Sequence, residues 1–144
     1  MTTLNQILQV KGQSVWSVSP NDTVYDTIKL MADKNVGALV VLEGEKLTGI
    51  ISERDYARKV ILKGKSSRET AVKEIMSSDV VTIRPNQSIE ECMALMTHKR
   101  VRHLPVLEGD KLLGMISIGD IVKAIISEQE YTIKQLENYI TGGR

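Results

Sequence analysis

Two copies of a seven-residue motif contain the side chains best suited to chemistry. Residues 49–55 and 114–120 share the pattern Gly, two apolar residues, Ser, two variable residues and Asp. Each motif lies where a strand pattern changes to a helical one, so the Ser can cap the helix and the Asp can complement its positive end. The same groups suit a nucleoside phosphate. Helix N–H groups and a hydroxyl bind phosphate, and a carboxylate accepts hydrogen bonds from ribose hydroxyls.

A pair of basic side chains breaks the symmetry between the two copies. Arg102-His103 precedes a strand pattern, whereas the first copy has Gly37-Ala38 at the matching positions. One interpretation is a solvated strand end. The other is a phosphate clamp, in which each charge-assisted hydrogen bond contributes about 1.5–3 kcal/mol. Arg54, inside the first motif, is a candidate for the same task at a second site.

The two motifs belong to a longer internal repeat. Residues 20–57 align with residues 85–122 without a gap, at a constant offset of 65. A duplicated supersecondary unit usually means that one copy cannot bury its apolar face alone. Two copies are too few for a solenoid, so we expect a closed pair related by a pseudo-twofold axis. Functional residues are then expected in the cleft between the copies.

Each copy is predicted to run strand, helix, strand, strand, helix. Thr23 and Ser88 are predicted helix N-caps, because an acidic residue follows each of them three positions later. A Glu-Gly-acidic turn joins the last two strands of each copy in a hairpin. The first copy is expected to place strands at 15–18, 38–42 and 46–52 and helices at 24–34 and 53–62. The second copy is expected to place strands at 80–83, 104–107 and 111–117 and helices at 89–99 and 118–128.

Three further segments complete the organisation. Residues 63–69 are polar and contain Gly and Ser, which predicts a linker between the copies, and residues 71–76 predict a short helix. The tail, residues 127–139, is predicted to continue as a helix whose apolar stripe either folds back on the body or packs against a second chain. The apolar positions of this tail are Tyr131, Leu136, Tyr139 and Ile140.

Composition and charge limit the classes of function. The chain has 144 residues, is 42% hydrophobic and 26% charged, and has a formal net charge of +1, so no global charge argument favours nucleic acid. Its start lacks a signal-peptide pattern, and no stretch reaches the apolar length of a membrane span, about 20 residues. The single cysteine, Cys92, excludes an internal disulfide and fits a reducing compartment. We expect a soluble, cytoplasmic protein with no membrane or nucleic-acid partner.

The chain is poorly equipped as an enzyme. Its two histidines, His98 and His103, do not lie at metal-ligand spacing with cysteine or acidic residues. The sequence contains no P-loop and no G-x-S-x-G elbow. We therefore predict a non-enzymatic protein with no catalytic residues, no metal and no catalytic cofactor.

The duplicated units ending in G-h-h-S-x-x-D, with the Arg-His-Leu-Pro-Val segment at residues 102–106, resemble a tandem pair of CBS domains, the Bateman module. The resemblance covers residues from about 7 to 126. It implies an α/β (α+β) fold of two pseudo-symmetric β-α-β-β-α repeats packed sheet to sheet, with a C-terminal helical extension. We expect the first CBS repeat at residues 1–66 and the second, with the C-terminal helix, at residues 67–144. Such modules usually form homodimers and commonly bind adenosine-containing ligands in two clefts.

The resemblance also assigns residues to a first ligand site by position. Asp120 is expected to hold the ribose. The residues expected to bind the phosphates are Ser117, Gly119, Arg102 and His103. The residues expected to contact the adenine, from the opposite repeat, are Lys11, Trp16, Val36, Gly37 and Ala38.

A second site is expected to be weaker or to prefer a different ligand, because Gly37-Ala38 cannot supply a basic pair. The resemblance assigns the ribose of this site to Asp55 and its phosphate to Ser52 and Arg54. The residues expected against its adenine are Met76, Val81, Val101 and the backbone near Arg102.

Two hypotheses about function follow. The first is a stand-alone regulatory module that binds AMP, or else ATP, ADP or NAD(H), and signals energy or redox state to a separate effector protein. S-Adenosylmethionine is less favoured, because Arg102 and His103 would repel its sulfonium. The second is a non-catalytic dimerisation or interaction scaffold whose motifs only cap helices. The basic pair and the duplicated aspartate favour the first hypothesis.

Overall fold

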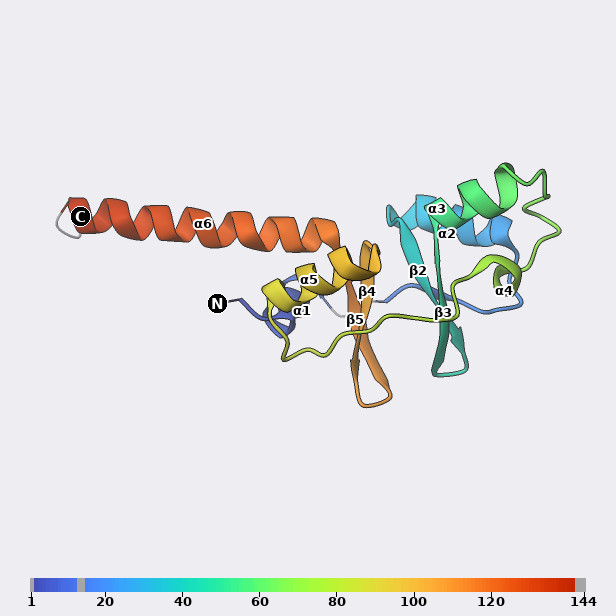
Figure 1. Ribbon diagram of the computed structural model, residues 1–144, viewed down its shortest axis with the longest axis horizontal. Coiled ribbons are helices and arrows are strands. Elements are labelled where there is room, and N and C mark those ends of the chain that lie inside the picture. Colours follow the sequence, from blue (N-terminus) through green and yellow to red (C-terminus); the bar gives the residue numbers. More distant parts are fainter. Residues whose placement is uncertain (1, 13–14, 142–144) are drawn as a thin grey trace. The chain divides into compact units, whose positions relative to one another are not determined.

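Two compact units make up the computed structural model, which describes residues 2–12 and 15–141 (Figure 1). The Asp55 unit comprises the described residues of Ser14–Thr82 and Gly109–Leu112. The Asp120 unit comprises those of Met1–Gln13, Ile83–Glu108 and Leu113–Arg144. Each unit combines helices with a small sheet, so the predicted mixed α/β fold is confirmed. The repeat boundary between residues 66 and 67 stays a prediction.

The Asp55 unit is built on a three-stranded sheet. Its strand β1 (Ser17–Val18) pairs parallel with β2 (Ala38–Glu43), and β2 pairs antiparallel with β3 (Lys46–Ser52). Its helices are α2 (Val24–Lys34), α3 (Glu53–Tyr56), the π-helix η1 (Ala57–Ile61) and α4 (Val72–Ile75). The helix predicted at 53–62 is therefore α3 continued by η1. The buried apolar core of this unit is Val18, Val24, Met31, Leu39, Val41, Ile51, Val60, Val72 and Ile75.

The Asp120 unit repeats this plan around a β-hairpin. The strands β4 (His103–Glu108) and β5 (Lys111–Ser117) form a two-stranded sheet. Its helices are α1 (Leu4–Lys11), α5 (Ile89–Lys99) and α6 (Ile118–Ile140). Its buried apolar residues include Leu4, Leu8, Ile83, Ile89, Cys92, Met96, Leu104, Val106, Ile116 and Ile121.

The helix ends follow the sequence prediction in both copies. Thr23 Oγ1 accepts a hydrogen bond from Asp26 N (3.1 Å), and Ser88 Oγ accepts one from Glu91 N (3.1 Å). These bonds satisfy N–H groups that have no partner inside the helix. The helices end where the chain turns left-handed, with φ of 54° at Asn35 and 56° at Arg100. The predicted caps and ends of α2 and α5 are confirmed.

The first strand of each copy is shorter than predicted, and most of the second one is missing. Residues 80–83 form only one bridge among the described residues, from Ile83 to Val106, with Ile83 N donating to Pro105 O at 3.0 Å. A parallel ladder that continued to Val81 would need an N–H at position 105. Proline has none, whereas the first copy has Val40 at the matching place and forms β1. The prediction of a strand over 80–83 is therefore wrong.

The short helices α1 and α4 occupy equivalent places in the two units. Leu4 N and Asn5 N of α1 donate to Gln87 O (3.2 Å) and Pro85 O (3.0 Å). The equivalent bonds of α4 run from Val72 N to Asp22 O (2.9 Å) and from Lys73 N to Pro20 O (2.9 Å). The helix that precedes each copy in sequence therefore packs in the unit formed mainly by the other copy. This exchange was not predicted, although residues 3–8 and 71–76 share an apolar pattern, because that pattern has an offset of 68 and lies outside the register of the longer repeat.

The motif glycines permit a close approach of these exchanged helices. A Cβ on Gly49 would lie 2.6 Å from Met76 Sδ and 3.0 Å from Ser77 O, and one on Gly114 would lie 2.6 Å from Leu8 Cδ2. The first contact includes backbone, which cannot rotate away. We expect Gly49→Ala to lower the free energy of unfolding by about 1–3 kcal/mol, measured by urea denaturation. Gly114→Ala, which meets only a flexible side chain, is expected to cost less; an equal or larger cost would contradict this packing.

The tail continues α6 without a break. No Gly or Pro lies between Asp120 and Ile140, so nothing in the sequence ends the helix there. The predicted apolar stripe is exposed, with 57–85% of each of its residues accessible. The fold-back alternative is therefore wrong, since α6 projects past α1 and α5 of its own unit (Figure 1). Within residues 2–12 and 15–141, no helix has the length and apolarity to cross a bilayer.

Candidate functional site

The Ser and Asp of each motif form a reciprocal capping box. Asp120 N donates to Ser117 Oγ at 3.2 Å, and Ser117 N donates to Asp120 Oδ2 at 2.8 Å. In the first copy Asp55 N donates to Ser52 Oγ at 3.2 Å, and Ser52 N donates to Asp55 Oδ2 at 2.9 Å. The capping role predicted for both Ser residues is confirmed. It fixes the carboxylate beside the start of the helix, where an anion or a hydroxyl can approach.

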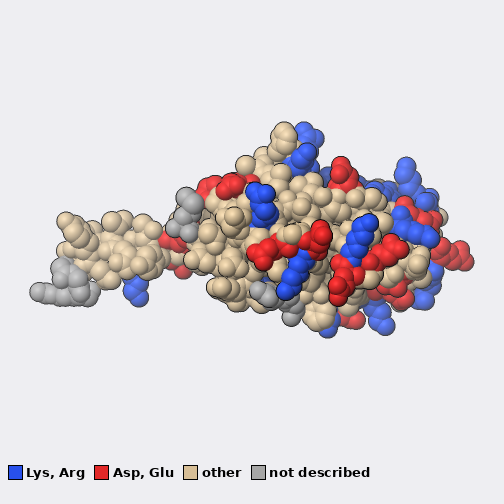
Figure 2. All heavy atoms as spheres, turned by 90° about the horizontal axis from the view of Figure 1, so that it is seen from below, with Lys and Arg blue, Asp and Glu red and all other residues tan. Residues whose placement is uncertain are grey.

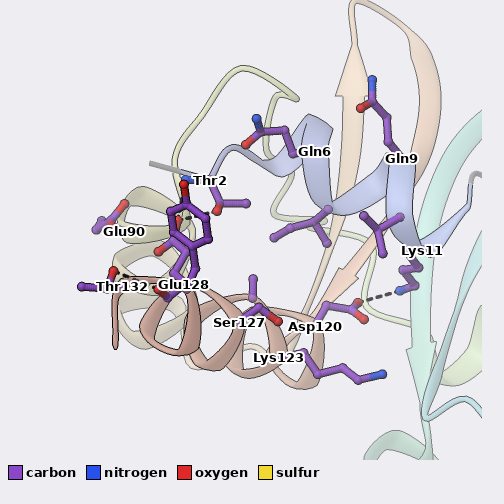
Figure 3. Close-up of a pocket in the computed structure, with 14 residues that line it drawn as sticks. Thr2, Gln6, Gln9, Lys11, Glu90, Asp120, Lys123, Ser127, Glu128 and Thr132 are labelled. Atoms are coloured by element: carbon purple, nitrogen blue, oxygen red, sulfur yellow. Dashed lines mark hydrogen bonds and ion pairs between the residues drawn. The ribbon is translucent and has the colours of Figure 1, made fainter. Parts of the chain in front are cut away.

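Asp120 also forms an ion pair with a distant lysine (Figure 3). Lys11 Nζ, at the end of α1, lies 2.6 Å from Asp120 Oδ2 and donates to Met115 O at 2.7 Å. Burial by itself would raise the pKa of Asp120, but the hydrogen bonds from Lys11 and Ser117 and the Lys11 charge outweigh burial and lower it. Asp120 is therefore held ionised. The resemblance to CBS domains assigned Lys11 to the adenine, and the ion pair with Asp120 was not predicted.

Asp55 receives its cation from a different element. Lys59, one turn further along the same helical segment, lies 3.1 Å from Asp55 Oδ1 and donates to Ile75 O at 2.9 Å. Both carboxylate oxygens of Asp55 are therefore bonded, Oδ2 to Ser52 and Oδ1 to Lys59. At Asp120 both partners use Oδ2, so no described residue forms a hydrogen bond to Oδ1. Asp120 is thus better able to accept a new hydrogen bond.

The first N–H groups of α6 differ in their availability. Ile118 N donates to Arg102 O at 2.9 Å, and Asp120 N donates to the cap. The N–H of Gly119 has no partner among the described residues and lies at the positive end of a long helix. A Cβ at Gly119 would come no closer than 3.6 Å to Ser117 Oγ, so packing does not require glycine there. The position suits close approach of a phosphate to the backbone.

The basic pair lies at the start of β4, beside the Asp120 motif. Arg102 is exposed and His103 is half-buried. Burial lowers the pKa of His103, the charges of Lys11 and Arg102 lower it further, and Asp120 opposes them. Lys11, Arg102 and Asp120 therefore all lie close enough to His103 for their charges to affect its pKa. A carboxylate with a free oxygen and a surplus of positive charge therefore share one end of this unit.

We expect His103 to titrate below 6.5, the ordinary value for histidine. Because the pKa of His103 is lower in the folded protein than in the unfolded chain, folding favours the neutral imidazole. The contribution of His103 to the free energy of unfolding is therefore present above pH 6.5 and is lost as the pH falls from 6.5 to the lower pKa of the folded state. The positive charge of Lys11 lowers the pKa of His103, so Lys11→Met should raise that pKa. A 1H–15N NMR titration checks both statements, with Lys134→Met as a control on the distant part of α6. A midpoint at or above 6.5 in the unmodified protein would contradict this electrostatic account.

The remaining predicted residues divide between the two units. In the Asp55 unit Gly37 O accepts a hydrogen bond from Glu53 N at 3.0 Å, which places Gly37-Ala38 beside the Asp55 motif. The side chain of Met76 lies against Gly49 of that motif. Lys34 Nζ lies 4.2 Å from the centre of the Trp16 ring. Residues of the Asp55 unit assigned to either site are Trp16, Val36, Gly37, Ala38, Ser52, Arg54, Asp55, Met76 and Val81. Those of the Asp120 unit are Lys11, Val101, Arg102, His103, Ser117, Gly119 and Asp120.

A groove between α1 and α6 was not predicted (Figure 3). It has a volume of about 1240 Å³, and Lys11 and Asp120 lie on its wall. Glu128 accepts hydrogen bonds from Thr2 N (2.6 Å) and Thr2 Oγ1, and these bonds lower the pKa of its carboxyl group. The remaining lining residues are Gln6, Ile7, Gln9, Val10, Glu90, Lys123, Ala124, Ser127, Tyr131 and Thr132. The signal that the sequence offered was the helical periodicity of residues 4–11, which predicts α1 but not its place beside α6.

Comparison with known proteins gives relatives over nearly the whole chain. The chain is 42% identical over 152 residues to the CBS domain-containing protein CBSX3, mitochondrial, of Arabidopsis thaliana, covering 99% of this chain and 73% of that protein. The structure of a protein with CBS domains from Burkholderia ambifaria superposes with a TM-score of 0.86 at 55% identity, covering 89% of this chain and 96% of that one. The CBS domain pair of protein MJ0100, in complex with 5′-methylthioadenosine and S-adenosyl-L-methionine, superposes with a TM-score of 0.79 at 21% identity, covering 89% and 98%.

The family model for the CBS domain matches the chain twice, at residues 10–62 and 72–127. Each match contains one of the two capping-box motifs and the hairpin that leads into it. The chain therefore belongs to the CBS-domain proteins and carries a pair of CBS domains.

Proposed function

We propose that this protein is a regulatory module that binds an adenosine-containing ligand at the Asp120 motif. The observation that carries the proposal is the state of that aspartate. Asp120 is ionised, has one carboxylate oxygen free of hydrogen bonds from described residues, and lies beside Lys11 and the free N–H of Gly119. A ribose hydroxyl requires such an acceptor, and a phosphate requires such a donor.

The charges around Asp120 favour a ligand that carries phosphate. Arg102 and Lys11 supply positive charge, and His103 can gain a proton when a phosphate approaches. AMP satisfies these groups, and ATP, ADP or NAD(H) would need further cations such as Arg54, Arg58 and Lys59. The sulfonium of S-adenosylmethionine would be repelled. The complex of MJ0100 concerns a protein of 21% identity, so that likeness is one of fold, and the ligand is argued from this chain's own residues.

A second ligand is proposed at the Asp55 motif, with lower affinity. A ligand hydroxyl there has to compete with Lys59 for Asp55 Oδ1 or use the second lone pair of that oxygen, because Oδ2 already accepts a hydrogen bond and Oδ1 already forms an ion pair. Ser52 and Arg54 would take the phosphate. The adenine contacts assigned to each site, which include residues of both units, are part of this proposal.

The output of such a module is a change in another protein. We propose a cytoplasmic homodimer that binds its ligand better in one arrangement than in another and passes that difference to a separate effector protein. The competing function is a scaffold whose motifs only cap helices. The capping boxes are compatible with either function, but a scaffold does not need a carboxylate oxygen that accepts no hydrogen bond from the described residues, as Asp120 Oδ1 is.

A thermal-shift screen of ligand-free protein tests the proposal. AMP, ADP, ATP, NAD, NADH and S-adenosylmethionine are each added at about 100 times a plausible Kd, where occupancy of one site stabilises the fold by about 2.7 kcal/mol. We expect the largest rise in Tm with AMP. A response to a different adenine compound would change the ligand but keep the function, and no response to any of them would favour the scaffold.

A further inference from the structure

One face of α6 carries a heptad pattern that the nucleotide site does not use. The α6 seam consists of Val122, Ile126, Gln129, Ile133, Leu136 and Ile140. Their spacings alternate between four and three residues, as the a and d positions of a coiled coil do. All but Gln129 are aliphatic. The pattern continues from the part of α6 beside the hairpin to its end.

The α6 seam is exposed along its whole length. Its aliphatic members have between 49% and 81% of their surface accessible. At 100° per residue the seam lies roughly a quarter-turn or more from the buried Ile121 and from Glu128, which faces the groove. On the face shown in Figure 2 the projecting end of α6, at the left, carries few charged side chains. An exposed aliphatic row of this kind indicates a protein–protein contact.

We propose that the α6 seam pairs with the α6 seam of a second copy of this chain, in an antiparallel coiled coil. The seam is complementary to itself when two helices run in opposite directions and overlap completely. Val122 then faces Ile140 of the second copy, Ile126 faces Leu136, and Gln129 faces Ile133. Each a position meets a d position, so every aliphatic side chain of the seam gains an apolar neighbour except Ile133, which meets Gln129.

The charged residues that flank the α6 seam favour antiparallel over parallel pairing of the two helices. The residues at the e positions are Lys123, Glu130 and Glu137, and those at the g positions are Ile125, Thr132 and Tyr139. A parallel pair brings e next to g and forms no charge pair. The antiparallel pair brings Lys123 next to Glu137 of the second copy, twice by symmetry. Glu130 faces Glu130 at the twofold axis, which costs stability and limits the affinity.

This inference does not depend on the proposed ligand. Its first test is the mass of the full chain by light scattering over a range of concentrations. Leu136→Asp is expected to raise the Kd of self-association at least tenfold. Gln135→Asp is the matched control, because it adds the same charge in the same turn on the opposite face, and it should have no such effect. Circular dichroism checks that both variants remain folded.

The second test fixes the direction by cross-linking. Glu130→Cys places one thiol at the proposed twofold axis and should form a disulfide between copies, whereas Ile140→Cys should form one only in a parallel pair. Cys92 is buried, and the unsubstituted chain is the control. A further dimer contact elsewhere leaves this readout intact, because the disulfide reports α6 itself.

Charge-reversal variants test the proposed contact between Lys123 and Glu137 of the second copy. Lys123→Glu and Glu137→Lys should each weaken self-association, and the double variant should restore it. Glu130→Gln should strengthen it by removing the like-charge contact. An unchanged mass for Leu136→Asp together with no disulfide through Glu130→Cys, or cross-linking through Ile140→Cys but not Glu130→Cys, would overturn the antiparallel pair. A monomer at all concentrations, with α6 captured by another protein, would overturn the second copy as occupant.

Discussion

Asp120→Asn is expected to weaken AMP binding roughly 10- to 100-fold. The substitution keeps the shape of the side chain and an oxygen that can still accept from Ser117 N, so the cap of α6 is largely preserved. It removes the charge that makes a ribose hydroxyl bond strong. Loss of one charge-assisted hydrogen bond is worth about 1.5–3 kcal/mol, and each 1.4 kcal/mol is a factor of about ten. Isothermal titration calorimetry with AMP measures the change.

Two variants control for the general effect of losing an acid at a helix start. Asp26 occupies the same position after a capping residue in α2 but lies outside either motif. Asp26→Asn should leave AMP binding unchanged. Asp55→Asn should affect only a weaker second binding event. Equal losses in the Asp26 and Asp120 variants would show that the effect comes from stability, and no loss in Asp120→Asn would remove the ribose role of this residue.

Leu8→Ala is expected to give the largest loss of stability, about 2–5 kcal/mol. The side chain of Leu8 is fully buried and packs against Gly114, where it connects α1 to the hairpin of the Asp120 unit. Its truncation leaves a cavity that the neighbouring backbone cannot fill. Urea denaturation monitored by circular dichroism measures the free energy of unfolding. Val10→Ala, on the same helix but 92% exposed, is the matched control and should change little.

The same variant links the fold to the site. Lys11 reaches Asp120 only because α1 is docked, so a loosened α1 should also weaken the Lys11–Asp120 ion pair. We expect the pKa of His103 to rise in Leu8→Ala, as it does in Lys11→Met. A loss of stability below about 1 kcal/mol would be inconsistent with a buried Leu8. An unchanged pKa of His103 would show that the packing of α1 does not control the charges around Asp120.

Local features of the chain could be predicted because neighbouring residues create them. The caps at Thr23 and Ser88 and the ends at Asn35 and Arg100 depend on side chains within one helical turn. The hairpins depend on short turns with Gly in the left-handed conformation. The capping boxes of the two motifs are equally local. For these reasons the CBS repeat was correctly recognised, whereas the ligand role of its two aspartates stays a prediction.

Features that depend on distant residues could not be predicted in the same way. The cation beside Asp55 comes from the same helical segment, but the one beside Asp120 comes from α1. The sequence predicted a difference between the two sites only from the basic pair, whereas the structure shows that the two aspartates also differ in their hydrogen bonding. The missing strand over 80–83 has a similar cause, since a proline in β4 removes the donor that the other segment would need.

By itself, the sequence determined the repeat, the family and the secondary structure around each motif, and it predicted residues for a ligand site. These properties follow from side-chain type and spacing over a few residues. Only the tertiary structure decided that α1 and α4 are exchanged between the units, that Lys11 forms an ion pair with Asp120, and that the end of α6 stays exposed. Each of these depends on which backbone groups and apolar faces meet across long separations in the chain, and no local pattern encodes that choice.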